Sequence, residues 1–220
     1  WNNHTSILLG DYLFAQSFRL AATLSSTSAC RQIGEASRLV CEGEMRQVLQ
    51  RDALDVDEPT YFDMIRGKTA ELCRVACELG AEHAGADLAH REAMGRYGMA
   101  LGIAFQIADD YLDLWGNDDA VGKTLGTDVE QGKITLPIIR LLAMADPADR
   151  NRIARILRGP VADRVEAIRP FLLASDAKDY TRRTAERFRA DALAAIDSIP
   201  NSPAKAALVA IADFTVDRRF

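Results

Sequence analysis

Hydrophobic and polar positions along the chain repeat with the spacing of an α-helix. Between Ser6 and Leu24 apolar side chains recur every three or four residues, and Cys30 to Leu49 repeats the pattern. Acidic residues between Asp52 and Pro59 interrupt it. Thr60 then stands where a helix N-cap belongs, with Asp63 three residues further on. This spacing predicts a helix that begins after Thr60 and runs to about Gly80.

Another helix is predicted from the mid-80s to Trp115, and shorter helices follow it. Thr135, with Pro137 just inside, is typical of a helix start. Prolines and glycines at positions 147, 159, 160, 170 and 200 are expected to interrupt the rest. No segment alternates with the period of a strand. The pattern therefore predicts an all-α fold with a single helical domain over residues 1–220.

Composition and charge narrow the class of protein. The chain is 48% apolar and 27% charged, enough to bury a core. Its 27 Lys and Arg against 32 Asp and Glu give a net charge of −5, which argues against nucleic acid as a partner. The apolar stretch Tyr97–Ala108 is shorter than the ~20 residues of a membrane-spanning helix. Four cysteines are too few for a disulfide scaffold, so we expect a reduced cytoplasmic location.

Three aspartates fall within one turn of the helix predicted to end at Trp115. Asp109 and Asp113 are four residues apart on one face, and Asp110 lies about 100° round the axis from Asp109. Apolar neighbours indicate partial burial, which increases the repulsion between the carboxylates. A divalent cation would relieve it, and all-oxygen ligands suit magnesium bound together with substrate phosphates. The alternative is an acidic turn exposed to solvent.

The loop after this helix, Gly122 to Lys133, favours the magnesium interpretation. It alternates glycines with Lys123 and Lys133 and adds Asp128, which makes a plausible cradle for a diphosphate and a metal ion. The Gly-Lys-Thr at its start resembles the end of a Walker A loop. That motif needs glycine where Asn117 stands, and it follows a strand, so we do not predict nucleotide binding.

Two features of the earlier helices are less specific. Lys68 and Thr69 lie within the helix predicted after Thr60 and carry little information alone. Gly95, Gly98 and Gly102 each cost a helix about 1 kcal/mol relative to alanine. Close approach of another helix, or room for a ligand, would explain them.

Taken together, these motifs resemble the trans-isoprenyl diphosphate synthases, and among them the polyprenyl synthases that make quinone side chains. Phe105-Gln106 followed by DDYLD and then Gly-Lys is the most specific combination. The resemblance extends along the whole chain, through GDYLFA from Gly10, GEMRQ from Gly43, YFDMIRGKTAEL from Tyr61, the loop Gly122 to Lys133 and the final DRRF.

This resemblance implies an isoprenoid synthase-type helical bundle and a magnesium-assisted, head-to-tail (1′-4) condensation. An allylic prenyl diphosphate and isopentenyl diphosphate would give a polyprenyl diphosphate. The implied magnesium ligands are Asp109, Asp110 and Asp113. The implied substrate-binding residues are Lys68, Thr69, Gln106, Lys123 and Lys133, with Asp128 in support. Lys68, Thr69 and Asp109 would take part in catalysis.

The sequence departs from the family pattern at its start. Relatives carry a first aspartate-rich motif upstream of the Gly-Asp-Tyr stretch, whereas here only ten residues precede Asp11. We therefore expect the chain to be the C-terminal portion of a synthase, without the N-terminal helices of the fold and inactive alone. Two alternatives stay open. A terpene cyclase would not depend on isopentenyl diphosphate, and a non-catalytic subunit of a heteromeric synthase would have no need of the intact DDYLD motif.

The resemblance also implies a homodimer. In keeping with this, Cys30 to Leu49 carries apolar side chains around more than one face of its predicted helix.

Overall fold

The computed structural model describes residues 2–116 and 125–217, and over these residues it contains helices and no strand. The all-α prediction is confirmed. The helices are α1 (Asn3–Ala21), α2 (Ser28–Leu49), α3 (Glu58–Ile65), the π-helix η1 (Arg66–Ala70), α4 (Glu71–His83), α5 (Leu88–Trp115), α7 (Thr127–Glu130), α8 (Leu136–Met144), α9 (Pro147–Leu157), α10 (Val161–Ala174), α11 (Ala177–Ala195) and α12 (Pro203–Asp217).

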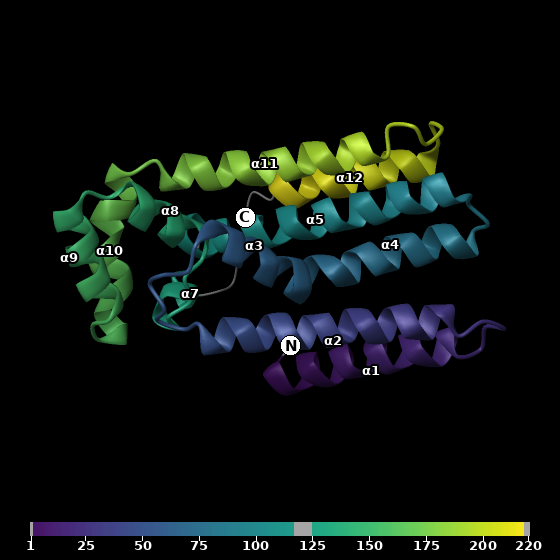
Figure 1. The fold of residues 1–220 in the computed structure, drawn as a ribbon, viewed down its shortest axis with the longest axis horizontal. Helices are drawn as coiled ribbons and strands as arrows, with labels where there is room; N and C mark the ends of the chain where they lie inside the picture. Colours follow the sequence, from purple (N-terminus) through teal and green to yellow (C-terminus); the bar gives the residue numbers. More distant parts are fainter. Residues whose placement is uncertain (1, 117–124, 218–220) are drawn as a thin grey trace.

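The long helices lie side by side in layers (Figure 1). α1 and α2 form one edge, α3, η1 and α4 form the next layer, α5 follows, and α11 with α12 covers its other side. The short helices α7 to α10 gather at one end of the bundle. The C-terminal end of α5, which carries the three aspartates, lies near that end.

Aspartate side chains set the starts of several helices. The Asp57 carboxylate accepts a hydrogen bond of 3.0 Å from the Thr60 amide, and Asp87 accepts one of 2.9 Å from His90. The prediction of Thr60 as an N-cap is therefore wrong by one turn. Glu58 and Pro59 already occupy the first turn, where a proline has no amide hydrogen bond to lose, and Asp57 supplies the cap.

Prolines mark most of the later boundaries, with one exception. Pro137 and Pro147 lie in the first turns of α8 and α9, as the sequence indicates. Pro170 instead lies inside α10, so the predicted interruption there is wrong. The bond that Pro170 cannot make would go to the carbonyl of Glu166. Both residues are exposed, so water can satisfy that carbonyl.

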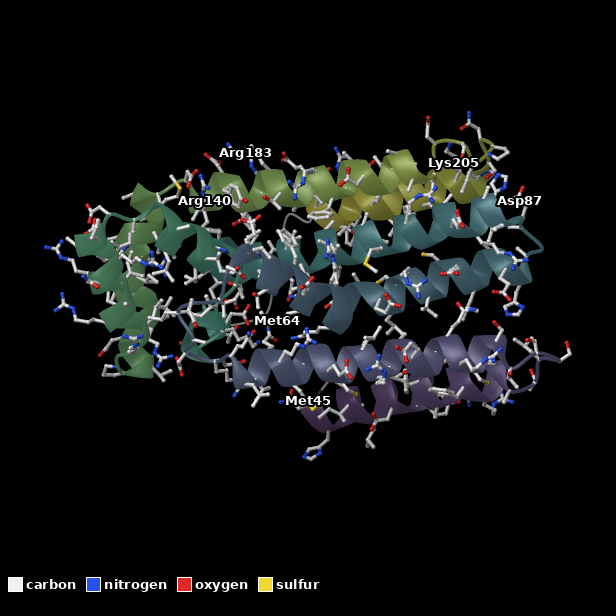
Figure 2. The ribbon with its side chains drawn as sticks, in the orientation of Figure 1. Met45, Met64, Asp87, Arg140, Arg183 and Lys205 are labelled. Carbon is white, nitrogen blue, oxygen red and sulfur yellow. The ribbon has the colours of Figure 1, made fainter. Side chains whose placement is uncertain are left out.

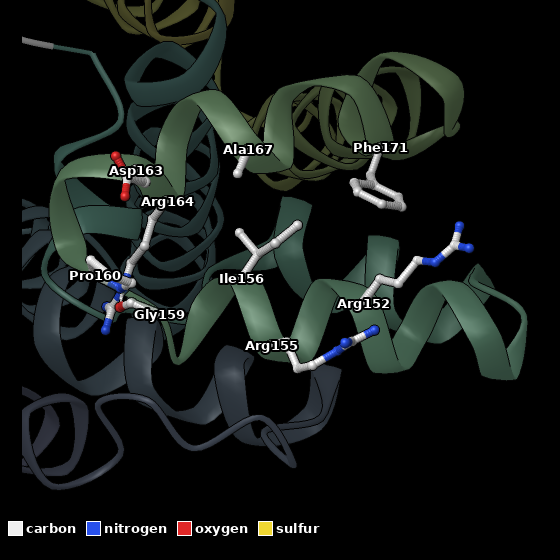
Figure 3. A pocket seen from close by; sticks show the side chains of 9 residues that line it. All are labelled: Arg152, Arg155, Ile156, Gly159, Pro160, Asp163, Arg164, Ala167 and Phe171. Carbon is white, nitrogen blue, oxygen red and sulfur yellow. Dashed lines mark hydrogen bonds between the residues drawn. The ribbon is translucent and has the colours of Figure 1, made fainter.

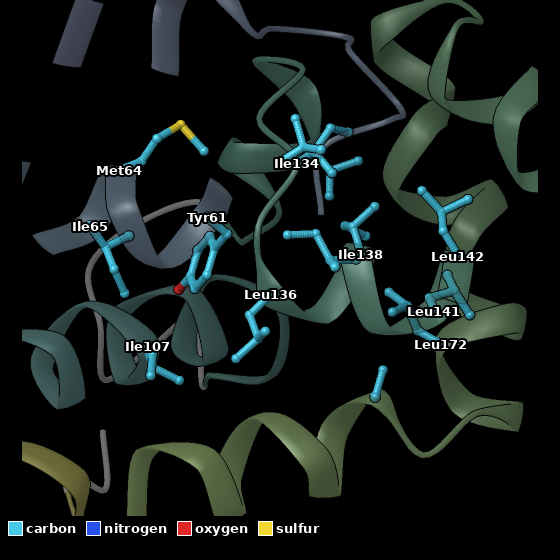
Figure 4. Close-up of a cluster of buried hydrophobic side chains, with 14 of the residues drawn as sticks. Tyr61, Met64, Ile65, Ile107, Ile134, Leu136, Ile138, Leu141, Leu142 and Leu172 are labelled. Atoms are coloured by element: carbon cyan, nitrogen blue, oxygen red, sulfur yellow. The ribbon is translucent and has the colours of Figure 1, made fainter. Parts of the chain in front are cut away.

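η1 and α4 pack closely against α5 because α5 presents glycines to them. A Cβ on Gly102 would lie 2.5 Å from the Ala70 Cα, and one on Gly98 would lie 2.5 Å from the Cys73 carbonyl oxygen. Close helix approach is thus what these two glycines permit. Beyond them, Tyr61, Ile107 and Leu136 join α3, α5 and α8 in a buried core next to the aspartates (Figure 4).

Large apolar side chains of α1 and of the C-terminal end of α2 are exposed. We call this set the α1 face, and it consists of Ile7, Leu8, Tyr12, Leu13, Leu20, Met45, Val48 and Leu49. Figure 2 shows side chains projecting from this layer, with Met45 labelled. Exposed apolar side chains that lie close together are typical of protein–protein contact surfaces. Within the described residues, no helix is long and apolar enough to cross a membrane.

Candidate active site around the aspartate turn of α5

Asp110 lies at the centre of a buried hydrogen-bond network. Its carboxylate accepts a hydrogen bond of 2.6 Å from the Tyr61 hydroxyl and one of 2.9 Å from the Gln106 amide. The side-chain carbonyl of Gln106 in turn accepts a bond of 2.8 Å from the Thr69 hydroxyl. Three elements, α3, η1 and α5, are joined in this way around one carboxyl group.

Burial and neighbouring charge together disfavour ionisation of Asp110. Burial, followed by the negative charge of Asp128, raises the pKa of Asp110 to about 7, against the opposing effect of the hydrogen bonds from Tyr61 and Gln106. The charge of Asp109 adds to the rise. Burial also raises the pKa of Tyr61 well above its usual value, so its phenol stays protonated as a donor. A positive charge brought to this site would lower the cost of ionising Asp110.

Asp113 ties the aspartate turn to the short helix α7. Its carboxylate accepts a hydrogen bond from the Thr127 hydroxyl and one of 3.1 Å from the Asp128 amide. Burial raises the pKa of Asp113, and the hydrogen bond from Thr127 and the charge of Lys133 oppose that rise. The Asp113 carbonyl also accepts a bond of 2.6 Å from the Gly126 amide. Asp113 therefore fixes the start of α7 as well as contributing charge.

Lys133 brings positive charge to this region, directly after the α7 turn. Its ammonium group lies 2.8 Å from the Asp128 carboxylate, and both side chains are largely buried. Asp128 is thus placed between Asp113 and Lys133, where the sequence predicts a supporting acid. Lys123, the other predicted lysine of the loop, lies outside the described residues.

Lys68 and Thr69 are consecutive residues that reach two different helices. Lys68 lies 2.9 Å from the Glu44 carboxylate and donates a bond of 2.6 Å to Gln47, both on α2. Thr69 reaches α5 through Gln106. Both residues lie in η1, whose wide turn is closed by a bond from the Glu71 amide to the Arg66 carbonyl. Such single π-turns are frequent at functional sites.

α2 approaches this π-turn closely. A Cβ on Gly43 would lie only 2.6 Å from the Lys68 backbone nitrogen. Gly43 therefore lets the Lys68 backbone rest against α2, from which Glu44 and Gln47 bind the Lys68 ammonium group. These three residues belong to the GEMRQ segment, which the resemblance includes but to which the sequence alone assigns no contact.

Asp109 is half-buried on α5, one residue before the Asp110 network. Over residues 2–116 and 125–217, no group of three His, Cys, Asp or Glu side chains is already arranged to hold a metal ion. The donor set nonetheless suits a hard cation, because it consists of carboxylates, and burial together with the charges of Asp128 and Asp109 raises the pKa of Asp110. Magnesium needs only one or two carboxylates when it also binds phosphate oxygens.

Sequence reasoning missed Tyr61 and Thr127. Tyr61 is 49 residues from Asp110 in the chain, so no local spacing connects them. The only available signal is that a tyrosine on the apolar face of a helix needs a buried acceptor for its hydroxyl. Thr127 stands beside the predicted Asp128, but its bond to Asp113 depends on how the loop returns to α5.

Comparison with known proteins identifies the family. The sequence profile described as "Polyprenyl synthetase" matches residues 1–172. The chain belongs to the polyprenyl synthetase family. It is 31% identical to octaprenyl diphosphate synthase of Haemophilus influenzae, with 100% of this chain and 67% of that protein aligned. It is 30% identical to heptaprenyl diphosphate synthase component 2 of Bacillus subtilis, over 100% of this chain and 63% of that protein.

Solved structures of this family share the fold. The polyprenyl synthase from Caulobacter crescentus complexed with calcium and isoprenyl diphosphate is 37% identical, with a TM-score of 0.87 over 100% of this chain and 68% of that one. The resemblance to long-chain trans-prenyl synthases and the isoprenoid synthase-type helical fold are both confirmed. The chain spans about two thirds of the length of these relatives.

Proposed function

We propose that the protein is a prenyltransferase that joins an allylic prenyl diphosphate to isopentenyl diphosphate, head to tail, and so makes a polyprenyl diphosphate. Its membership of the polyprenyl synthetase family supports this activity, and relatives named octaprenyl diphosphate synthase support a role in quinone biosynthesis. The observation that carries the proposal is the crowding of Asp109, Asp110 and Asp113 beside Lys133, with Asp110 buried and its pKa raised.

In the proposed site, Asp109, with Asp113 and Asp110, would hold magnesium on the diphosphate of the allylic substrate. Bound magnesium would neutralise charge on the departing diphosphate. Asp113 keeps its carboxylate in place through Thr127 and the Asp128 amide. Asp110 is held by Tyr61 and Gln106, so the aspartate turn is rigid before substrate arrives.

The lysines would compensate the charge that grows on the leaving group. In the reaction the C–O bond to diphosphate breaks, the double bond of isopentenyl diphosphate attacks the allylic carbon, and a proton is lost from the adduct. Lys68, Lys123 and Lys133 are the proposed counter-charges, and Thr69 and Gln106 the proposed neutral donors. Pre-placed cations lower the barrier to a step in which an oxygen gains negative charge.

We also propose that the protein forms a homodimer through the α1 face, in a reducing, cytoplasmic location. The exposed apolar side chains Leu8, Tyr12 and Leu13 support the homodimer, since burying them against a second copy would remove apolar surface from water. The four cysteines are free thiols, which suits a reducing compartment.

The activity is tested with the protein encoded by its full reading frame. Incubation with magnesium, an allylic prenyl diphosphate and labelled isopentenyl diphosphate should give an elongated prenyl diphosphate. In a second mixture without isopentenyl diphosphate the allylic substrate carries the label, and a labelled hydrocarbon or alcohol product there would indicate a terpene cyclase instead. No product with either mixture would favour a non-catalytic subunit.

The site is tested separately, by binding. Calorimetry should detect magnesium-dependent binding of a bisphosphonate, and Asp109→Ala should abolish it. Asp179→Ala, which changes an exposed aspartate on α11, is the matched control and should bind like wild type. Equal affinity of the Asp109→Ala and wild-type proteins would contradict the assigned role of the aspartate turn.

A further inference from the structure

Arg164 is a buried arginine in the first turn of α10, outside the site described above. Only 8% of its surface is exposed. In Figure 3 its side chain extends from α10 toward Gly159 and Pro160, at one end of a cavity of about 490 Å³ between α9 and α10. A buried guanidinium destabilises the fold unless acceptors surround it. Its acceptors therefore show which parts of the chain it joins.

Those acceptors lie on three separate segments. Arg164 Nε donates to the Gly159 carbonyl at 3.1 Å, which anchors the arginine within its own hairpin. Nη1 lies 3.0 Å from the Asp52 carboxylate, in the connection between α2 and α3. The same nitrogen lies 3.5 Å from the Val129 carbonyl in α7. One side chain thus connects α10 to both segments that meet beside the aspartate turn.

Asp52 transmits this contact to Gly132. Its amide donates a bond of 2.8 Å to the Gly132 carbonyl, and a Cβ on Gly132 would lie 2.5 Å from the Asp52 Oδ1 atom. Both residues have a left-handed backbone, with φ of 58° at Asp52 and 71° at Gly132. Asp52 can adopt this conformation at modest cost, and Gly132 at none. The carboxylate that binds Arg164 therefore rests directly on the residue before Lys133.

The two residues that Arg164 and Asp52 contact, Val129 and Gly132, are adjacent in the chain to two residues of the candidate site. Val129 follows Asp128, and Gly132 precedes Lys133. The turn between them is closed by a bond of 2.9 Å from the Lys133 amide to the Asp128 carbonyl. Holding Val129 and Gly132 therefore fixes both ends of this turn. Asp128, whose amide binds Asp113, lies at its first end, and Lys133, whose ammonium group binds Asp128, lies at its second end.

We propose that Arg164 and Asp52 form a positioning pair for the Asp128–Lys133 turn, and that they set the affinity of the site for a metal-bound diphosphate without touching it. This inference rests on the proposed function, because it assigns a purpose to the position of Lys133. Loss of the pair would leave the fold and the aspartate turn in place, while the turn that carries Lys133 would sample other positions.

The first test is a double-mutant cycle on the full chain, with magnesium-dependent bisphosphonate binding measured by calorimetry. Arg164→Met and Asp52→Asn should each weaken binding by about 10-fold, the lower end of the usual effect of residues that orient a metal site. Arg164→Lys, which can still reach Asp52, should recover part of the affinity. Arg169→Met, on the exposed side of the same helix, should change nothing.

The cycle is completed in a Lys133→Met background. If Arg164 acts through the turn, Arg164→Met should weaken binding in the Lys133→Met background by no more than about twofold, because the effects of coupled substitutions are not additive. A further 10-fold loss in that background would overturn the proposal. Asp52→Asn keeps the test valid if Arg164→Met does not fold, since Asp52 is half-exposed and asparagine tolerates its backbone conformation.

A second measurement separates this proposal from the proposed function. Amide hydrogen exchange of residues 127–133 needs no ligand and should speed up in Asp52→Asn and Arg164→Met, but not in Arg169→Met. Faster exchange in a protein that binds no bisphosphonate would support the positioning pair and contradict the prenyltransferase assignment. Unchanged exchange in both variants would overturn the positioning pair, whatever the binding data.

Discussion

The Tyr61 hydroxyl donates a hydrogen bond of 2.6 Å to the Asp110 carboxylate, across 49 residues of sequence. Tyr61 is fully buried in the core between α3, α5 and α8, and Asp110 is only 3% exposed. The bond therefore fixes one acid of the DDYLD turn against the hydrophobic core. Asp109 and Asp113 are left on the less buried side of α5, where a ligand can reach them.

Replacing Asp110 with asparagine should stabilise the metal-free protein at neutral pH. The pKa of Asp110 is about 7 in the folded protein, against 3.8 for an unperturbed carboxyl. Asparagine removes the buried charge and keeps the network, because Gln106 can turn its amide over and accept from the new donor. We expect a gain of about 1 to 4 kcal/mol in the free energy of unfolding at pH 8.

The same pKa shift gives the effect a pH dependence. The folded state binds the Asp110 proton more tightly than the unfolded state does, so protonation of Asp110 stabilises the fold. This stabilisation is fully present below pH 3.8 and is lost as the pH rises through about 7. Melting temperatures of Asp110→Asn and wild type should thus diverge as the pH rises from 3.8 to about 7 and stay a constant distance apart above it. Parallel curves would show that the carboxyl is not buried as described. Asp179→Asn is the exposed control.

Removing the Tyr61 hydroxyl should destabilise the protein. Tyr61→Phe keeps the packing of the ring but leaves the buried Asp110 with one donor fewer, at a cost of about 1–3 kcal/mol. The hydroxyl also opposes the rise in the pKa of Asp110, so that pKa should increase further. Urea unfolding measures the first effect. Tyr12→Phe, on an exposed tyrosine, should have little effect.

Glycines on facing helices should respond in opposite ways to alanine. Gly102→Ala places a methyl group 2.5 Å from the Ala70 Cα and should destabilise the protein by about 1–3 kcal/mol. Gly80→Ala in α4 meets nothing within 4 Å and should stabilise it by up to about 1 kcal/mol. Thermal unfolding of the two variants compares them directly. Equal shifts of the same sign would contradict the close approach of α5 to the π-turn.

A charge on the α1 face should dissociate the proposed homodimer. Leu13 is 60% exposed in the single chain, and Leu13→Glu would place a carboxylate in the interface. Sedimentation should then give the mass of a monomer, whereas Lys178→Glu, at an exposed position of α11, should sediment as a dimer. A monomeric wild-type protein would contradict the dimer itself.

Much of the fold follows from local pattern, and much of the site does not. The period of apolar residues locates the long helices to within a few residues, and the spacing of Asp109 and Asp113 predicts their shared face. The π-turn at Arg66–Ala70 is not visible in the sequence, because its residues suit an ordinary helix equally well. The bond from Thr69 to Gln106 depends on tertiary packing over 37 residues. The roles assigned to the site residues, and a single domain over 1–220, stay predictions.

The π-turn also links the candidate active site to the packing of the bundle. It contains one residue more than an α-helical turn, and each added residue rotates everything after it by about 100°. The stripe of α4 that meets α5 is therefore in phase only because this residue is present. A deletion within Arg66–Ala70 would redirect Lys68 or Thr69 and turn the buried face of α4 outward in the same step. Substitutions along this segment can therefore be tolerated, whereas a change in its length requires α4 to repack against α5.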